Sequence, residues 1–142
     1  MSLVLDASAA LAWMFERTDP DERALAEQLL NEIADQPVRV PSLWHLEVAN
    51  VLLVAERRGV AKEADVINFR QRLSRLPIVT DDFEISLRHE MILALGRQFH
   101  LSAYDATYLE LALRTGSILA TFDTRLAGAM QQAGGKVYTS SD

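Results

Sequence analysis

The first eleven residues, MSLVLDASAAL (residues 1–11), decide how the rest of the chain is arranged. Three apolar residues, Leu3–Leu5, run directly into Asp6, and small residues that favour helices follow. A short apolar run that ends at a turn-forming acid is typical of a buried strand that leads into a helix. In an open α/β sheet this junction lies at the carboxyl edge, where ligands bind. The pattern therefore predicts that Asp6 faces a cleft.

Further strand-like runs alternate with helical segments along the remaining chain. The first predicted helix covers residues 8–15, and further short segments predicted as strands lie at residues 38–40, 77–80, 117–122 and 136–139. Strands that are separated by helices indicate a parallel sheet covered on both faces. We expect an α/β fold with a three-layer α/β/α architecture and about five short parallel strands. Residues 1–142 are expected to form a single domain.

The composition is that of an ordinary globular protein, with 49% hydrophobic and 24% charged residues. The absence of cysteine excludes disulfides, zinc–thiolate sites and cysteine nucleophiles. No apolar run approaches the roughly 18 residues of a membrane span, and no basic segment precedes the first apolar run, as a signal peptide requires. We therefore expect a cytoplasmic protein. The net charge of −6 disfavours indiscriminate binding of nucleic acid, unless some of the acids surround a metal ion.

Four carboxylates stand in contexts that point to a site: Asp6, Glu47, Asp105 and Asp123. Asp6 and Asp123 each follow a predicted strand, so a parallel topology places both at the same edge of the sheet. Glu47 lies on an apolar face of its predicted helix, where an ionised carboxylate is costly unless it is paired or bound to a cation. Asp105 lies at the start of a later helix. Together these positions predict one acidic cluster.

Each acid also has a purely structural explanation. Asp is a favoured helix N-cap, which suits Asp6 and Asp123, and Asp105 lies three residues after Ser102, as in a capping box. Glu47 can extend from the rim of the apolar face into solvent. If the four acids do lie together, however, they repel one another and need protons or metal ions. Hard oxygen donors without cysteine or a paired-histidine motif favour Mg²⁺ or Mn²⁺.

Four segments, in this order, resemble the PIN-domain ribonucleases and, more narrowly, the VapC toxins of type II toxin–antitoxin systems. They are VLDASAAL, LWHLEVANVL, LSAYDATYLELA and LATFDTRL, and they span most of the chain. The resemblance implies an endoribonuclease that hydrolyses RNA phosphodiester bonds with carboxylate-held Mg²⁺ or Mn²⁺. It also implies that the catalytic and metal-binding residues are Asp6, Glu47, Asp105 and Asp123.

The same resemblance implies further site residues and partners. Ser8 and Thr121 match positions where the family often has a hydroxyl that supports the site. The implied partners are an RNA substrate, a VapB-like antitoxin whose C-terminal segment enters the active-site groove, and a second copy in a homodimer, with no membrane partner. Arg17 and Arg125 are candidate contacts to RNA phosphates, although a solvated surface position is the alternative for each of them.

Other functions stay open on the sequence alone. A non-catalytic PIN-like module would bind RNA or protein through the same cleft, and the loss of an acid would have favoured it. A metal-dependent phosphatase is disfavoured because Ser8 stands where the common phosphatase signature has a second aspartate. A pure interaction domain whose acids are all helix caps does not explain Glu47. We therefore predict the ribonuclease, with the non-catalytic module as the alternative.

Overall fold

The computed structural model describes residues 2–139 and shows a parallel sheet between two groups of helices. Met1 and residues 140–142, which the single-domain prediction also includes, lie outside the described residues. Among the described residues, four strands pair in the order β3-β2-β1-β4. They are β1 (Leu3–Leu5), β2 (Val38–Val40), β3 (Ile78–Thr80) and β4 (Ile118–Ala120). Every pairing is parallel, with Leu3 beside Val38 on one side and beside Ile118 on the other.

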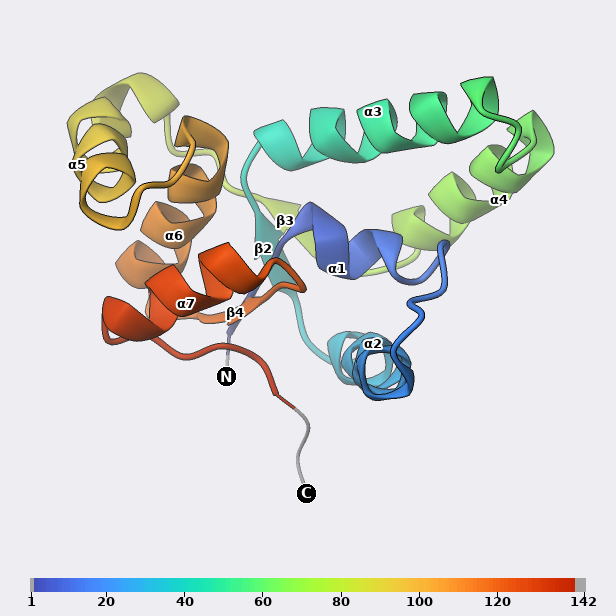
Figure 1. The fold of residues 1–142 in the computed structure, drawn as a ribbon, viewed down its shortest axis with the longest axis horizontal. Coiled ribbons are helices and arrows are strands. Elements are labelled where there is room, and N and C mark those ends of the chain that lie inside the picture. Colours follow the sequence, from blue (N-terminus) through green and yellow to red (C-terminus); the bar gives the residue numbers. More distant parts are fainter. Residues whose placement is uncertain (1, 140–142) are drawn as a thin grey trace.

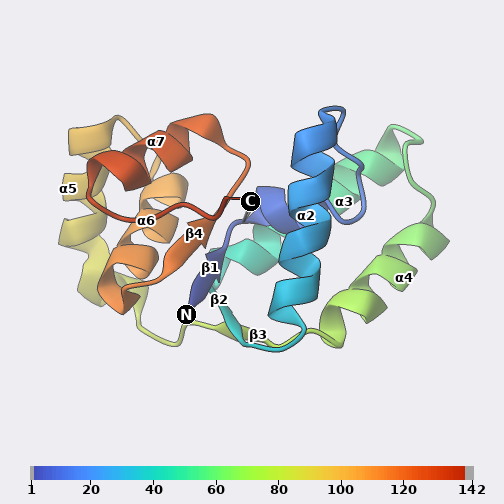
Figure 2. The same cartoon turned by 90° about the horizontal axis from the view of Figure 1, so that it is seen from below.

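Helices cover the sheet from two sides, as the two views in Figure 1 and Figure 2 show. One group contains α1 (Ala7–Leu11), α2 (Pro20–Ile33), α3 (Leu43–Arg57) and α4 (Glu63–Ser74). The other contains the 3₁₀ helix η1 (Ile85–Arg88), α5 (His89–Phe99), α6 (Ala103–Thr115) and α7 (Thr124–Gln132). The three-layer α/β/α architecture confirms the predicted fold class.

The core lies where β1 meets α6. All three residues of β1 are completely buried, which explains its uninterrupted apolar sequence, since both faces of a central parallel strand are covered. Residues 106–112 of α6 are also buried, and this helix packs against both β1 and β4. Because β1 is held in this core, the position of Asp6, which directly follows β1, is fixed as well.

The expected fifth strand at residues 136–139 is not formed. Val137 makes only an isolated parallel bridge to Leu119, whose N–H donates to the Lys136 carbonyl oxygen at 2.9 Å. Val137 and Tyr138 are the apolar residues of this segment, so little side-chain burial supports a longer ladder. The prediction of about five strands was therefore one too high for residues 2–139.

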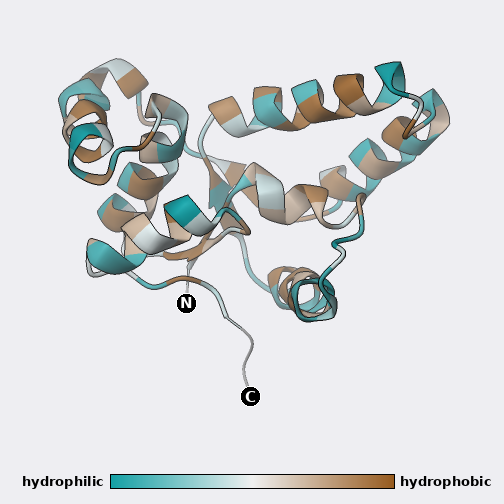
Figure 3. Cartoon of the chain, in the orientation of Figure 1, coloured by the Kyte–Doolittle hydropathy of each residue, from teal (hydrophilic) through white to brown (hydrophobic). Residues whose placement is uncertain are grey.

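Helices α3 and α4 form an arm on the side of the molecule away from α5. Figure 3 shows apolar residues recurring along both of these helices. A groove of about 600 Å³ is lined by side chains of the two helices, among them Val48, Leu52, Val66 and Leu73. Glu47 stands on this arm. Within residues 2–139, every helix is too short or too polar to cross a lipid bilayer.

Candidate functional site

The acids at the ends of β1 and β4 lie at the same edge of the sheet. Leu5 pairs with Ala120 at the ends of the two strands, and the Asp6 N–H donates to the Ala120 carbonyl oxygen at 2.9 Å. Asp6 directly follows Leu5, the last residue of β1, and Asp123 follows Ala120, the last residue of β4, by three positions. The parallel topology thus brings together two of the four predicted site residues, as the sequence pattern indicated.

Two hydroxyl groups hold the Asp6 carboxylate. Its Oδ2 accepts hydrogen bonds from Ser8 Oγ at 2.7 Å and from Thr121 Oγ1 at 2.6 Å. The same hydroxyl oxygens accept from the backbone, Ser8 Oγ from the Phe122 N–H and Thr121 Oγ1 from the Asp123 N–H, both at 3.0 Å. Asp6 is almost fully buried, so these bonds both orient the carboxylate and satisfy it.

The helix-cap explanation holds for some of the acids and fails for Asp6. Asp123 caps α7, because its Oδ1 accepts from the N–H groups of Arg125 at 2.9 Å and Leu126 at 3.1 Å. Asp6 occupies the N-cap position of α1 but makes no side-chain capping hydrogen bond. At α6 the cap is Ser102, whose Oγ accepts from the Asp105 N–H at 3.1 Å. Capping therefore does not account for the buried position of Asp6.

Glu47 is half-buried on α3 and has a tyrosine as its partner. The Tyr108 hydroxyl donates to Glu47 Oε1 at 2.6 Å, and the Tyr108 side chain is fully buried in α6. From the sequence we expected the Glu47 carboxylate to be paired or bound to a cation, but we did not predict Tyr108 as its partner. The available signal was its spacing, since Tyr108 follows Asp105 by three positions and so lies on the same face of the helix.

Burial and neighbouring negative charge raise the pKa of three of the four acids. Burial is the largest cause of the raised pKa of Asp6, of Glu47 and of Asp105. The charge of Asp123 raises the pKa of Asp6 and of Asp105 further, and the charge of Asp6 does the same for Glu47 and for Asp105. Hydrogen bonds from hydroxyl groups oppose these shifts at Asp6 and Glu47. The four carboxylates are therefore close enough for their charges to affect one another's neighbours in the cluster.

The donor set has the chemistry that a hard divalent cation needs. Within residues 2–139, none of the ion pairs involves any of the four carboxylates, so no paired arginine or lysine neutralises their charge. In the same part of the chain, no group of three or more acidic or histidine side chains is arranged to hold an ion as it stands. Carboxylate oxygens are the ligands that Mg²⁺ and Mn²⁺ prefer, so these residue types suit such an ion.

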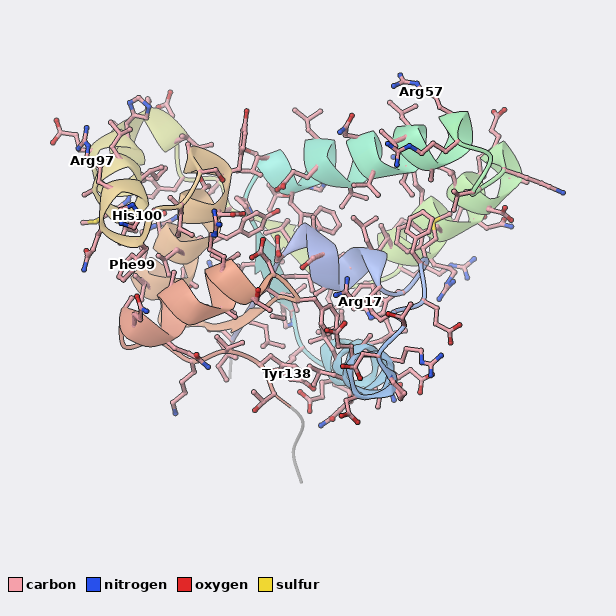
Figure 4. All side chains as sticks on the ribbon, in the orientation of Figure 1. Arg17, Arg57, Arg97, Phe99, His100 and Tyr138 are labelled. Atoms are coloured by element: carbon pink, nitrogen blue, oxygen red, sulfur yellow. The ribbon has the colours of Figure 1, made fainter. Side chains whose placement is uncertain are left out.

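Both candidate phosphate-binding arginines lie near the acids. The Arg17 guanidinium lies over the Phe122 ring, 4.9 Å from its centroid, and its Nε donates to Glu22 Oε2 at 2.6 Å. Figure 4 shows Arg17 beside α1, near the middle of the molecule. Arg125, exposed in the first turn of α7, lowers the pKa of Asp105 by its positive charge. Arg125 thus supplies positive charge beside the acids, whereas the charge of Arg17 is paired with Glu22.

A buried ion-pair network, which the sequence analysis missed, fixes another part of α6. Glu110 Oε1 accepts from Arg88 Nε at 2.6 Å and from Arg114 Nε at 2.8 Å. Arg114 Nη2 also donates to Asp81 Oδ2 at 2.7 Å, and both guanidinium groups lie over the Phe83 ring. The spacing of Glu110 and Arg114 by four positions was the visible signal. The network ties residues 81–88 to the helix that carries Asp105.

The raised pKa of Asp105 predicts how the metal-free protein responds to pH. A carboxyl group whose pKa is higher in the folded state binds its proton more tightly in that state. The folded state therefore loses stability as the pH rises above the pKa of this group in the unfolded chain, which is 3.8 for Asp105. Asp105→Asn removes the charge. In EDTA we expect the Tm of this variant to match that of the wild type near pH 4 and to exceed it near pH 8.

Thermal melts at both pH values test this expectation, with the exposed Asp35→Asn as the control for loss of one negative charge. A Tm difference that is the same at both pH values would show that repulsion at Asp105 does not weaken the metal-free fold.

Comparison with known proteins shows the family and the fold of the chain. Residues 3–129 match the PIN domain family. The chain is 31% identical over 139 residues to Ribonuclease VapC3 of Pyrobaculum aerophilum, which covers 89% of this chain and 93% of that protein. A relative of this identity and coverage shares the family of the chain as well as its fold.

Two solved structures share the fold. The crystal structure of PAE2754 from Pyrobaculum aerophilum has a TM-score of 0.67 at 22% identity, covering 91% of this chain and 79% of that one. The crystal structure of FitAcB from Neisseria gonorrhoeae has a TM-score of 0.54 at 18% identity, covering 98% and 97%. Together with the matches in sequence, they show that the chain belongs to the PIN-domain family, in its VapC-type branch.

Proposed function

We propose that this protein is a metal-dependent endoribonuclease and the toxin of a type II toxin–antitoxin pair. The observation that carries the proposal is the cluster of four carboxylates, which form no ion pair within residues 2–139 and whose charges help to raise the pKa of Asp6, Glu47 and Asp105. Such a cluster is electrostatically costly unless it binds a cation. The 31% identity to Ribonuclease VapC3 supports RNA as the substrate.

The acids would divide the work of phosphodiester hydrolysis between them. Asp6, Asp105 and Asp123 would hold Mg²⁺ or Mn²⁺, directly or through water. When bound, the ion lowers the pKa of an attacking water and stabilises charge on the phosphoryl group and on the leaving oxygen. Glu47 is either a further ligand or the base that orients the attacking water. The non-catalytic PIN-like module remains the alternative function.

The neighbouring polar residues would support these roles. Ser8 and Thr121 keep the buried Asp6 carboxylate in one orientation through their hydroxyl hydrogen bonds. Arg17 and Arg125 would contact phosphates of the RNA near the groove, where their charge offsets the repulsion between RNA and an acidic protein.

The experiment that tests the function is cleavage of a mixed cellular RNA pool by the purified protein. We expect discrete cuts with Mg²⁺ or Mn²⁺ and none with EDTA, because the carboxylates alone cannot activate the water. Sequencing of the fragment ends then identifies the target. Cleavage that continues unchanged in EDTA would contradict the proposal. Absence of both cleavage and Mn²⁺ binding in calorimetry would favour the non-catalytic module.

The proposal includes a VapB-like antitoxin and a homodimer as protein partners. Exposed apolar side chains support protein contacts, above all Leu46 on α3 and Leu87 on η1, which are 76% and 70% exposed. Exposed residues of this kind favour protein interfaces when they gather into a patch. In the cleavage assay, we expect an antitoxin expressed from the neighbouring reading frame to stop the reaction, and an unchanged rate would contradict the pairing.

A further inference from the structure

Tyr108 is a buried residue that contacts the acidic cluster through Glu47 without being an acid itself. Its side chain is 0% exposed and packs in the hydrophobic core, while its hydroxyl reaches Glu47 Oε1 at 2.6 Å. The two residues come from different helices, α6 and α3. Helix α6 therefore carries Asp105 and, through the Tyr108 hydroxyl, also holds Glu47 of α3.

We propose that Tyr108 is a positioning residue that fixes the Glu47 carboxylate for its role at the metal site. The proposal rests on the proposed function. It concerns a residue that does not touch the substrate but sets the direction in which Glu47 presents its oxygens.

The geometry supports positioning because the two partners differ in freedom. A glutamate side chain rotates about several bonds, and Glu47 is only half-buried, so solvent offers it other orientations. Tyr108, in contrast, is held by the surrounding core on every side. A hydrogen bond of 2.6 Å from a hydroxyl to a carboxylate is short and strong, as expected when the acceptor is charged. Tyr108, which is fixed by the core, therefore sets the orientation of the more mobile Glu47 carboxylate.

The requirement for positioning follows from the spread of the site. The four carboxylates are carried by different elements: Asp6 follows β1, Glu47 lies on α3, Asp105 lies on α6 and Asp123 is the N-cap of α7. Each oxygen that is already directed correctly reduces the rearrangement needed on binding. Asp6 is fixed in the same manner by its two hydroxyl donors, which makes Tyr108 the corresponding support for Glu47.

The test compares Mn²⁺ binding by calorimetry with steady-state cleavage in Tyr108→Phe. We expect Mn²⁺ affinity to fall about 10-fold to 100-fold, as is typical when a group that orients a metal ligand is removed. We also expect kcat to fall while KM for RNA stays near that of the wild type, since the hydroxyl does not contact RNA. Tyr138→Phe is the matched control, because Tyr138 is also buried but lies beside α2, on a different part of the molecule.

A double-mutant cycle separates positioning from a purely structural role. In a Glu47→Ala background, Tyr108→Phe should have no further effect on Mn²⁺ affinity, because the carboxylate on which it acts is gone. Glu47→Asp provides a second way to break the same hydrogen bond, and its effect should likewise not add to that of Tyr108→Phe. An equal loss of affinity in both backgrounds would overturn the proposal.

The outcomes also distinguish this inference from the proposed function. If the wild type binds Mn²⁺ and cleaves RNA, but Tyr108→Phe does both equally well, the positioning role is wrong and the nuclease stands. If the wild type neither binds Mn²⁺ nor cleaves RNA, the nuclease is wrong and the role of Tyr108 falls with it. If Tyr108→Phe loses thermal stability but keeps its Mn²⁺ affinity and its cleavage rate, the hydroxyl is merely structural.

Discussion

Asp6→Asn is expected to lower metal-dependent RNA cleavage by roughly 100-fold or more, at least as much as the loss of a group that only orients a metal ligand. The amide oxygen of asparagine can still accept from Ser8 and Thr121, which now donate to Asp6 Oδ2. The shape of the site is therefore kept while its most buried negative charge is removed. Cleavage rates with saturating Mn²⁺ measure the effect.

Stability gives the control for this variant. Because burial raises the pKa of Asp6, its ionised form is costly in the metal-free protein, so the Tm of Asp6→Asn in EDTA should equal or exceed that of the wild type. Asp35→Asn, at an exposed position, should change neither cleavage nor Tm. Undiminished cleavage by Asp6→Asn would refute the metal-site assignment, and a large fall in Tm would make the carboxylate a structural group.

Glu110→Ala is expected to lower the free energy of unfolding by about 3 kcal/mol, the effect of removing one partner from a buried ion pair. Glu110 is 3% exposed and accepts from both Arg88 and Arg114. Without it, two guanidinium groups remain partly buried with fewer acceptors. We expect faster proteolysis within residues 81–88, since Arg88 and Asp81 are attached to α6 through this network.

Urea unfolding monitored by circular dichroism measures this loss. Glu16→Ala is the control, because its pair with Arg23 is long, at 3.8 Å, and largely exposed, and such pairs contribute roughly 0–1 kcal/mol. If Glu110→Ala cost no more than Glu16→Ala, the network would be a minor contributor to stability, and α6 would be held by its apolar packing alone.

The central strand β1 was predictable because burial on both faces leaves a continuous apolar run, Leu3–Leu5, in the sequence. Residues 38–40 and 77–80 were also placed at observed strands, although Arg39 and Val79 are exposed. The first helix was predicted to reach Phe15 but ends at Leu11. Beyond Leu11 the backbone continues in tighter turns, and the Trp13 indole donates to the Ala26 carbonyl oxygen at 2.9 Å, a distant contact that local apolarity does not report.

The site was predictable in its residue types and not in its internal contacts. Asp6 and Asp123 stand out because each follows a strand, and Glu47 because it is an acid on an apolar face. Two of their three hydroxyl partners lie far away along the chain: Tyr108 is 61 positions from Glu47, and Thr121 is 115 positions from Asp6, whereas Ser8 is two positions from Asp6. Periodicity describes one element at a time, so it cannot show which hydroxyl will meet which carboxylate.

The pairing of β1 with β4 has a consequence for synthesis of the protein. Leu3 leaves the ribosome early, but its partner strand begins only at Ile118. At ordinary elongation rates this separation corresponds to about 5–25 s, during which β1 lacks one of its two neighbours. Asp105 and Asp123 emerge in the same late stretch. A nascent chain therefore cannot assemble the acidic site, so the proposed nuclease activity arises only after the segment beyond Asp123 is free to fold.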